Sequence, residues 1–140
     1  MLAQNFMKPA DLDLTDEQFE ALCKTLVLLE TEKLRHVPGG MDLVNGNYAF
    51  SGRFNMSIWS GNSPCGTVAC IGGTAELIGN VSFGYHLRLK RTNLRLYRLF
   101  FPPMKSSMWS SITPQQAATA LRSYLTTGNP HWDLAVAWPL

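Results

Sequence analysis

Two cysteines lie five residues apart in the stretch "SPCGTVACIGG", which runs from Ser63 to Gly73. A thiol in the first turn of a helix is a stronger nucleophile, because the exposed backbone N–H groups and the helix dipole stabilise the thiolate. Ser63 followed by Pro64 is a typical helix start, since serine caps a helix well and proline is tolerated at the first helical position. We therefore predict a helix over residues 63–79 with Cys65 in its first turn.

A cysteine-dependent hydrolase is one function that Cys65 could serve. The stretch "CGTVACIGG" resembles the cysteine-then-helix start of papain-like peptidases, which implies a histidine base and a third group that orients it. His131 is the candidate base and Asp133 is the nearest candidate for the orienting group. Only nine residues follow His131, and the sheet that normally carries such a histidine is not evident in the sequence. We therefore favour no catalytic residue and keep the peptidase-like hydrolase as an alternative.

Close packing is the other role that this stretch predicts. Two cysteines five apart on a helix point about 140° away from each other, so they cannot share a metal ion or a disulfide. The chain also contains no C-x-x-C or H-x-x-x-H pair, and we predict neither a metal site nor a cofactor. Cysteine often behaves as a small buried hydrophobe. Four small residues fall within one arc of about 100° on the predicted helix and would let it pack closely: Gly66, Ala69, Cys70 and Gly73.

Charge is unevenly distributed along the chain. Residues 1–42 carry eight acidic and four basic side chains, whereas the segment from Leu77 to Trp132 carries seven basic side chains and no acidic one. Four arginines in the second segment are spaced three, four and three residues apart, so they would form one stripe on a continuous helix. Such a stripe attracts phosphates or an acidic protein surface, although it could also be a solvated face paired with the acidic first helix. The candidate binding residues are Arg88, Lys90, Arg91, Arg95, Tyr97 and Arg98.

Helical signals are clearest at the two ends of the chain. Thr15 and Gln18 form a capping box before a 3.6-residue apolar period, which predicts a helix from Asp16 to His36. Thr113 and Gln116 repeat the capping box, and Gly128 marks the end of that helix.

The middle of the chain is less regular. A shorter helix is predicted from Thr92 as its cap to the prolines at 102 and 103, while Tyr85–Lys90 could be either strand or helix. Residues 41–62 read as a loop with one short strand near 48–57. We therefore predict a mainly α fold, in which about four helices form a compact bundle around the buried central helix 63–79. The sequence does not decide whether a small β-hairpin is also present.

Length and composition are those of one globular domain. The 140 residues are 46% hydrophobic and 16% charged, so residues 1–140 are predicted to form a single domain with a loosely held start at 1–13. The start lacks the pattern of a secretory signal, and no apolar run is long enough to span a membrane, so we expect a cytoplasmic protein without a membrane partner. Three cysteines in a reducing compartment predict free thiols.

Several motifs resemble features of a group of small uncharacterised bacterial and phage proteins. The group shares a CGTxxCIxG element and a C-terminal AAxxLRxxLxTGxxxW segment, and the similarity covers roughly the last two thirds of this chain. Members carry a larger residue, often Trp or His, at the positions of Gly73 or Thr74. The resemblance implies a compact, mostly helical fold with no established activity. The motifs are "RFNMSIW" (Arg53–Trp59), "CGTVACIGG" (Cys65–Gly73), "LYRLFFPP" (Leu96–Pro103) and "AATALRSYLTTGNPHW" (Ala117–Trp132).

A small interaction protein without enzymatic activity is the function that we favour from the sequence. The resemblance implies a phage or mobile-element origin, for which an inhibitor or adaptor that binds a host protein or nucleoprotein is the expected role. The basic segment would carry the contact. A nucleic-acid-binding accessory protein and the hydrolase that uses Cys65 with His131 are the alternatives, and the oligomeric state is left open.

Overall fold

The computed structural model describes residues 5–37, 50–63 and 66–136, and for residues 60–63, 66 and 67 it describes the backbone only. The mainly α fold in one compact domain is confirmed. In chain order the elements are η1 (Pro9–Leu12), α1 (Asp16–Glu30), β1 (Arg35–His36), β2 (Arg53–Phe54), β3 (Ser60–Ser63), β4 (Gly66–Ala69), α2 (Ile71–Gly79), α3 (His86–Thr92), α4 (Leu94–Phe100), η2 (Ser106–Ser111), α5 (Pro114–Thr127) and α6 (Trp132–Val136).

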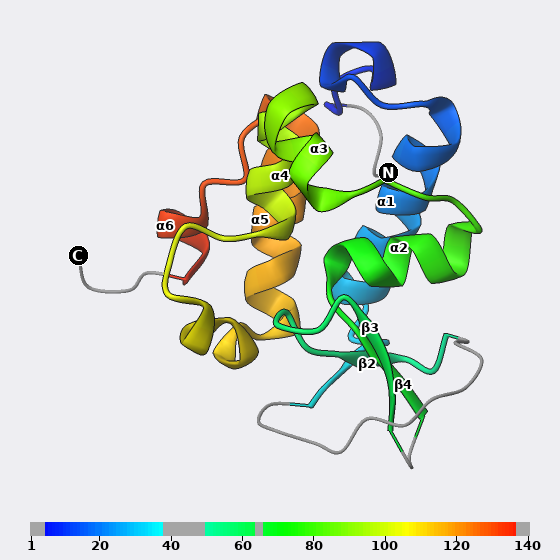
Figure 1. Cartoon of the computed structure of the whole chain (residues 1–140), viewed down its shortest axis with the longest axis vertical. Coiled ribbons are helices and arrows are strands. Elements are labelled where there is room, and N and C mark those ends of the chain that lie inside the picture. Colours follow the sequence, from blue (N-terminus) through cyan, green and yellow to red (C-terminus); the bar gives the residue numbers. More distant parts are fainter. Residues whose placement is uncertain (1–4, 38–49, 64–65, 137–140) are drawn as a thin grey trace.

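Helices α1, α2 and α5 build the core. Helix α1 packs against both α2 and α5, and Figure 1 shows α2 crossing α1 above the small sheet. The apolar period of α1 places Leu22 and Leu26 in this core, where they meet Ile71 from α2 and Leu121 from α5, all fully buried. Burial of these side chains is the main force that holds the helices together.

The sheet has four short strands in the order β1-β2-β4-β3. Strand β2 lies between β1 and β4 and is parallel to both, with Arg53 opposite Arg35 on one side and Val68 on the other. Strands β3 and β4 pair antiparallel, so the small β-hairpin on which the sequence did not decide is present, with its strands at residues 60–63 and 66–69. The strand predicted near residues 48–57 corresponds to β2, while residues 38–49 lie outside the described part of the chain.

The predicted boundary of the central helix is wrong. Helix α2 begins at Ile71, and residues 66–69, which we predicted to be helical, form strand β4. Thr67 and Val68 are β-branched, and such side chains suit a strand better than a helix. Cys70 is the N-cap of α2, and its Sγ accepts a hydrogen bond from the Gly73 N–H at 3.4 Å.

The small residues of this stretch therefore do not share one helix face. Gly66 and Ala69 belong to strand β4, Cys70 caps α2, and Gly73 lies in its first turn. Ala69, Cys70 and Gly73 are nevertheless buried, so they occupy a closely packed part of the core.

The end of α1 also differs from the prediction. The helix stops at Glu30 instead of His36, because Glu32 takes a left-handed conformation with φ 59° and Arg35–His36 pairs with β2. The Arg35 N–H donates to the Gly52 carbonyl at 2.7 Å. This pairing joins residues far apart in sequence, which a local helical period cannot indicate.

The other helices agree more closely with the sequence. Both predicted capping boxes are present, at the starts of α1 and α5, and α5 ends at Gly128 with φ 82°. Residues 86–92 are helical, so the alternative of a strand at Tyr85–Lys90 is wrong. Residues 5–13 pack against the helical core, with Leu12 fully buried and the Met7 N–H donating to the Leu125 carbonyl at 2.8 Å.

Candidate interaction surface

Asn93 divides the predicted basic helix into two. Its backbone, with φ −148° and ψ 75°, leaves the helical region, so α3 ends and α4 begins around it. The Asn93 side-chain oxygen accepts a hydrogen bond from the Leu96 N–H at 3.2 Å, which makes Asn93 the N-cap of α4 instead of Thr92. The prediction of one continuous stripe of arginines is therefore wrong, because these residues lie on two short helices.

Arg95 is engaged by the N-terminal segment of the chain. Its Nη2 donates to the Asp11 carbonyl at 2.7 Å and lies 3.8 Å from the Asp13 carboxylate. The neighbouring Asn93 side chain donates to the Leu12 carbonyl at 3.0 Å. Arg95 thus fastens α4 to residues 11–13.

Arg98 belongs to a different part of the surface. It lines a pocket of about 380 Å³ together with His131 and Asp133, and its carbonyl accepts a hydrogen bond from the Trp132 indole at 2.9 Å. Of the six predicted binding residues, Arg98 and Arg95 are therefore separated from the bases of α3.

Helix α3 carries the other basic residues among the predicted binding residues. Arg88, Lys90 and Arg91 are all exposed, and α3 packs on α4 through Leu89, its buried residue. The Lys90 ammonium lies 5.8 Å from the centre of the Tyr97 ring, a favourable cation–π distance. Within the described ranges, neither Arg88 nor Arg91 has a side-chain hydrogen bond or ion pair to the rest of the protein. Over the same ranges, no ion pair therefore neutralises either charge.

Beside α3 lies a small pocket with aromatic walls. It has a volume of about 210 Å³ and is lined by Trp59, Gly84, Tyr85, His86 and Leu89. The Tyr85 ring lies 4.8 Å from that of His86, and Tyr85 remains 64% exposed. The pocket is therefore open to solvent on its Tyr85 side.

Trp59 is held firmly in the wall of this pocket. Its indole N–H donates to one carboxylate oxygen of Glu76 at 2.7 Å, and the other oxygen of Glu76 accepts from the Phe83 N–H at 2.9 Å. The indole also stacks on Phe101, with ring centres 6.1 Å apart and an interplanar angle of 14°. The rigid first turn of α2 supports it, because a Cβ on Gly72 would overlap the ring.

The sequence reasoning missed Trp59, Tyr85 and His86 as candidate site residues. One signal was present: Glu76 is the only charged residue between Phe54 and Leu87, and an isolated carboxylate in an apolar segment needs a partner. That partner is the Trp59 indole. Nothing local indicates that Tyr85 and His86 complete the same pocket, because it forms only when α3 docks beside residue 59.

The hydrolase residues are not brought together in the part of the chain that is described. Cys65 lies outside the described residues, while His131 and Asp133 lie at the start of α6. Figure 1 shows α6 beside α5, away from the β3–β4 hairpin. Burial raises the pKa of the Cys70 thiol to about 12 and that of the Cys23 thiol to about 11. Both are therefore weak nucleophiles at neutral pH.

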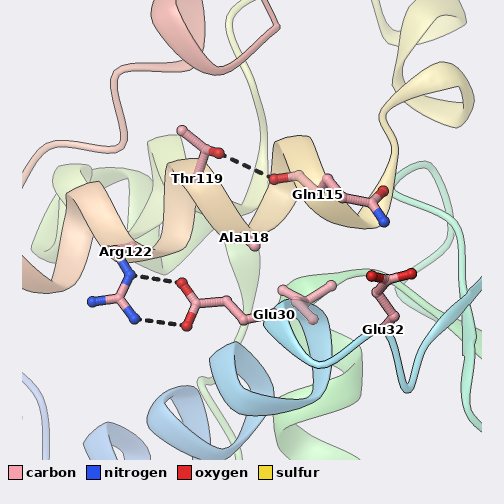
Figure 2. A pocket seen from close by; sticks show the side chains of 7 residues that line it. Glu30, Glu32, Gln115, Ala118, Thr119 and Arg122 are labelled. Carbon is pink, nitrogen blue, oxygen red and sulfur yellow. Dashed lines mark hydrogen bonds and ion pairs between the residues drawn. The ribbon is translucent and has the colours of Figure 1, made fainter. Parts of the chain in front are cut away.

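A third pocket, of about 420 Å³, lies between the end of α1 and α5 (Figure 2). Arg122 donates two hydrogen bonds of 2.6 Å to the two carboxylate oxygens of Glu30, and Figure 2 shows this pair closing one end of the pocket. The bond to Glu30 raises the pKa of Arg122. Glu32 and Gln115 lie at the other end. Arg122 is the one cation that lines this pocket, and it is already paired with Glu30. We therefore assign this ion pair the role of holding α1 and α5 together.

Comparisons with protein-family models, with curated proteins and with solved structures find no match for this chain. Among the described residues, no three His, Cys, Asp or Glu side chains are grouped as metal ligands. Over the same residues, the helices are too short or too polar to cross a bilayer.

Proposed function

We propose that this chain is a non-enzymatic interaction protein that binds an anionic surface of another macromolecule through α3. The observation that supports this most is the set of three exposed bases, Arg88, Lys90 and Arg91, on one short helix. The sequence supplies no acidic residue between Leu77 and Trp132 to neutralise them locally. A concentrated positive surface of this kind attracts anionic partners over several ångströms and speeds their association.

The surroundings of these bases also support a docking role. Tyr85 is 64% exposed and Leu87 is 51% exposed, so apolar surface lies next to the positive charge. Arginine and tyrosine are among the residue types enriched where proteins meet partners. A host protein or nucleoprotein is the partner that we propose, in line with an inhibitor or adaptor of phage or mobile-element origin.

Retention on immobilised heparin, a simple polyanion, tests the proposed surface. The triple variant Arg88→Ala, Lys90→Ala, Arg91→Ala is expected to elute at a much lower salt concentration than the unchanged protein. The control is Lys8→Ala, Lys24→Ala, Lys33→Ala, which removes the same charge from exposed positions in the acidic part of the chain. This control is expected to elute close to the unchanged protein.

Equal losses in the two triple variants would contradict the proposal, because net charge alone would then explain retention. A pull-down from the native host with the unchanged protein and the α3 variant then identifies the partner by mass spectrometry. Partners that depend on α3 are those lost with the variant.

A further inference from the structure

We infer that the anionic surface bound by α3 is single-stranded nucleic acid, such as that of the proposed nucleoprotein, and that the aromatic pocket beside α3 takes one of its nucleobases. This inference rests on the proposed function of α3 and names its partner. The observation behind it is that the pocket of Trp59, Tyr85 and His86 lies beside the exposed basic residues of α3. Proteins that bind single strands combine these two features, a positive surface for the phosphates and aromatic rings on which bases stack.

The walls of the pocket suit a flat aromatic ligand. Tyr85 and His86 contribute two adjacent rings, and Trp59 contributes a third. The Trp59 N–H is used by Glu76 and its ring is stacked on Phe101, so Trp59 contributes a fixed aromatic wall of the pocket. A Cβ at Gly84 would meet no atom within 4 Å, so the backbone at the edge of the pocket leaves open space. Stacking does not depend on base identity, because every base has a π-face.

Two basic residues of α3 follow the rings of the pocket at helical spacing, which brings positive charge near the phosphates of a strand whose nucleobase is stacked there. Arg88 follows Tyr85 by three residues and Lys90 follows His86 by four, so each basic side chain lies about one helical turn from a ring of the pocket. The Arg88 N–H donates to the Tyr85 carbonyl at 3.0 Å, which shows that the turn is formed. Glu76 does not line the pocket, and both of its oxygens accept hydrogen bonds from Trp59 and Phe83.

A single strand fits these observations better than a duplex or an acidic protein. In a duplex the base faces are covered by stacking, so the rings of the pocket would have nothing to contact. A protein carboxylate would use the α3 bases but would leave the rings of Tyr85 and His86 without a stacking partner.

Fluorescence anisotropy with a labelled oligothymidylate strand tests the inference. The pocket variant Tyr85→Ala, His86→Ala is expected to weaken binding by roughly 10-fold or more, because stacking contributes about 1–3 kcal/mol per base. Both side chains are exposed, so the fold should survive. Tyr85→Phe keeps the ring and is expected to retain the affinity of the unchanged protein. The pocket variant should leave heparin retention unchanged.

The α3 triple variant separates charge from stacking. It is expected to lose both strand binding and heparin retention, and to reduce the slope of log affinity against log salt by about 2, since three phosphate contacts contribute roughly 0.7 each. Equal binding of a blunt duplex and the single strand, or full binding by the pocket variant, would overturn the inference. If heparin retention still depends on α3 in that case, the proposed function stands and an acidic protein becomes the partner to seek.

Discussion

At the scale of single residues, two adjacent glycines determine how Trp59 lies against α2. A Cβ on Gly73 would overlap the Trp59 carbonyl oxygen, and a Cβ on Gly72 would overlap its indole ring. The first obstacle is backbone and the second is a side chain. The two positions therefore respond differently to the same substitution.

Gly73→Ala is expected to lower the free energy of unfolding by about 2 kcal/mol, because the Trp59 backbone cannot move away. At an unobstructed helical position the same change would add up to about 1 kcal/mol. Urea denaturation measures the difference. The background Trp59→Leu is the control, since it removes the ring and keeps the carbonyl. It should make Gly72→Ala neutral or stabilising without rescuing Gly73→Ala, and rescue of both would contradict the packing described.

Residue-level prediction from the sequence succeeded in part around Cys70. The stretch from Ser63 to Gly73 was expected to pack closely, and Cys70 and Gly73 are buried. The cap was assigned to Ser63 because serine before proline is the stronger local signal, whereas the structure uses Cys70. Pairing between β3 and β4 decides this point, and it depends on contacts outside the helix.

At the scale of elements, Asn93 determines where α3 ends and how α4 is attached. Its side chain caps α4 through Leu96 and also donates to the Leu12 carbonyl. Asn93→Ala is expected to lower the free energy of unfolding by about 2 kcal/mol, because it removes a cap and leaves a carbonyl without its donor. Chemical denaturation measures this change.

Two further variants make the Asn93 prediction specific. Thr92→Ala, one residue earlier and exposed, is expected to cost much less. Asn93→Asp keeps the capping oxygen but turns the donor into an acceptor that faces the Leu12 carbonyl, so it should be intermediate or worse. If Thr92→Ala proves as costly as Asn93→Ala, the assignment of the cap is wrong.

Element starts were easier to predict than element ends. The capping boxes of α1 and α5 are complete local signals, and both are present in the structure. The end of α1 was placed six residues too late because strand β1 is stabilised by β2, which comes much later in the chain. For the same reason, the spacing of the arginines could not reveal that Asn93 interrupts their helix.

At the scale of the whole molecule, the buried Cys70 thiol and the half-buried Cys23 thiol make stability depend on alkaline pH. Burial raises the pKa of Cys70 from 9.0 to about 12 and that of Cys23 from 9.0 to about 11. Above pH 9 the unfolded chain loses these protons while the folded protein keeps them, so the free energy of unfolding falls as pH rises. The buried Cys70 thiol contributes a slope of at most about 1.4 kcal/mol per pH unit between its two pKa values. The half-buried Cys23 thiol contributes less, because solvent screens it.

Urea denaturation at pH values on either side of 9 measures this loss of stability. The variant Cys70→Ala is expected to show a shallower fall with pH, because one of the two thiols no longer titrates. Other groups common to both proteins cancel in this comparison. An identical pH dependence in the two proteins would show that Cys70 is not protected from ionisation in the folded state.

The prediction of fold class from composition and period was correct, whereas the candidate site was predicted only in part. Arg88, Lys90 and Arg91 were recognised by charge, which is visible in the sequence. The aromatic pocket was not, because it gathers Trp59 with residues 84–89 across a distance that no local pattern spans.

The partnership between α1 and α5 bears on how the protein is made on the ribosome. Helix α1 can dock on α2 soon after α2 emerges, but the face that meets α5, and the Glu30 carboxylate that meets Arg122, wait until α5 has been synthesised. A nascent chain at that stage exposes apolar surface that the finished protein covers, and such surface attracts chaperones and promotes aggregation. Slow translation between α2 and α5 should therefore reduce the yield of this protein.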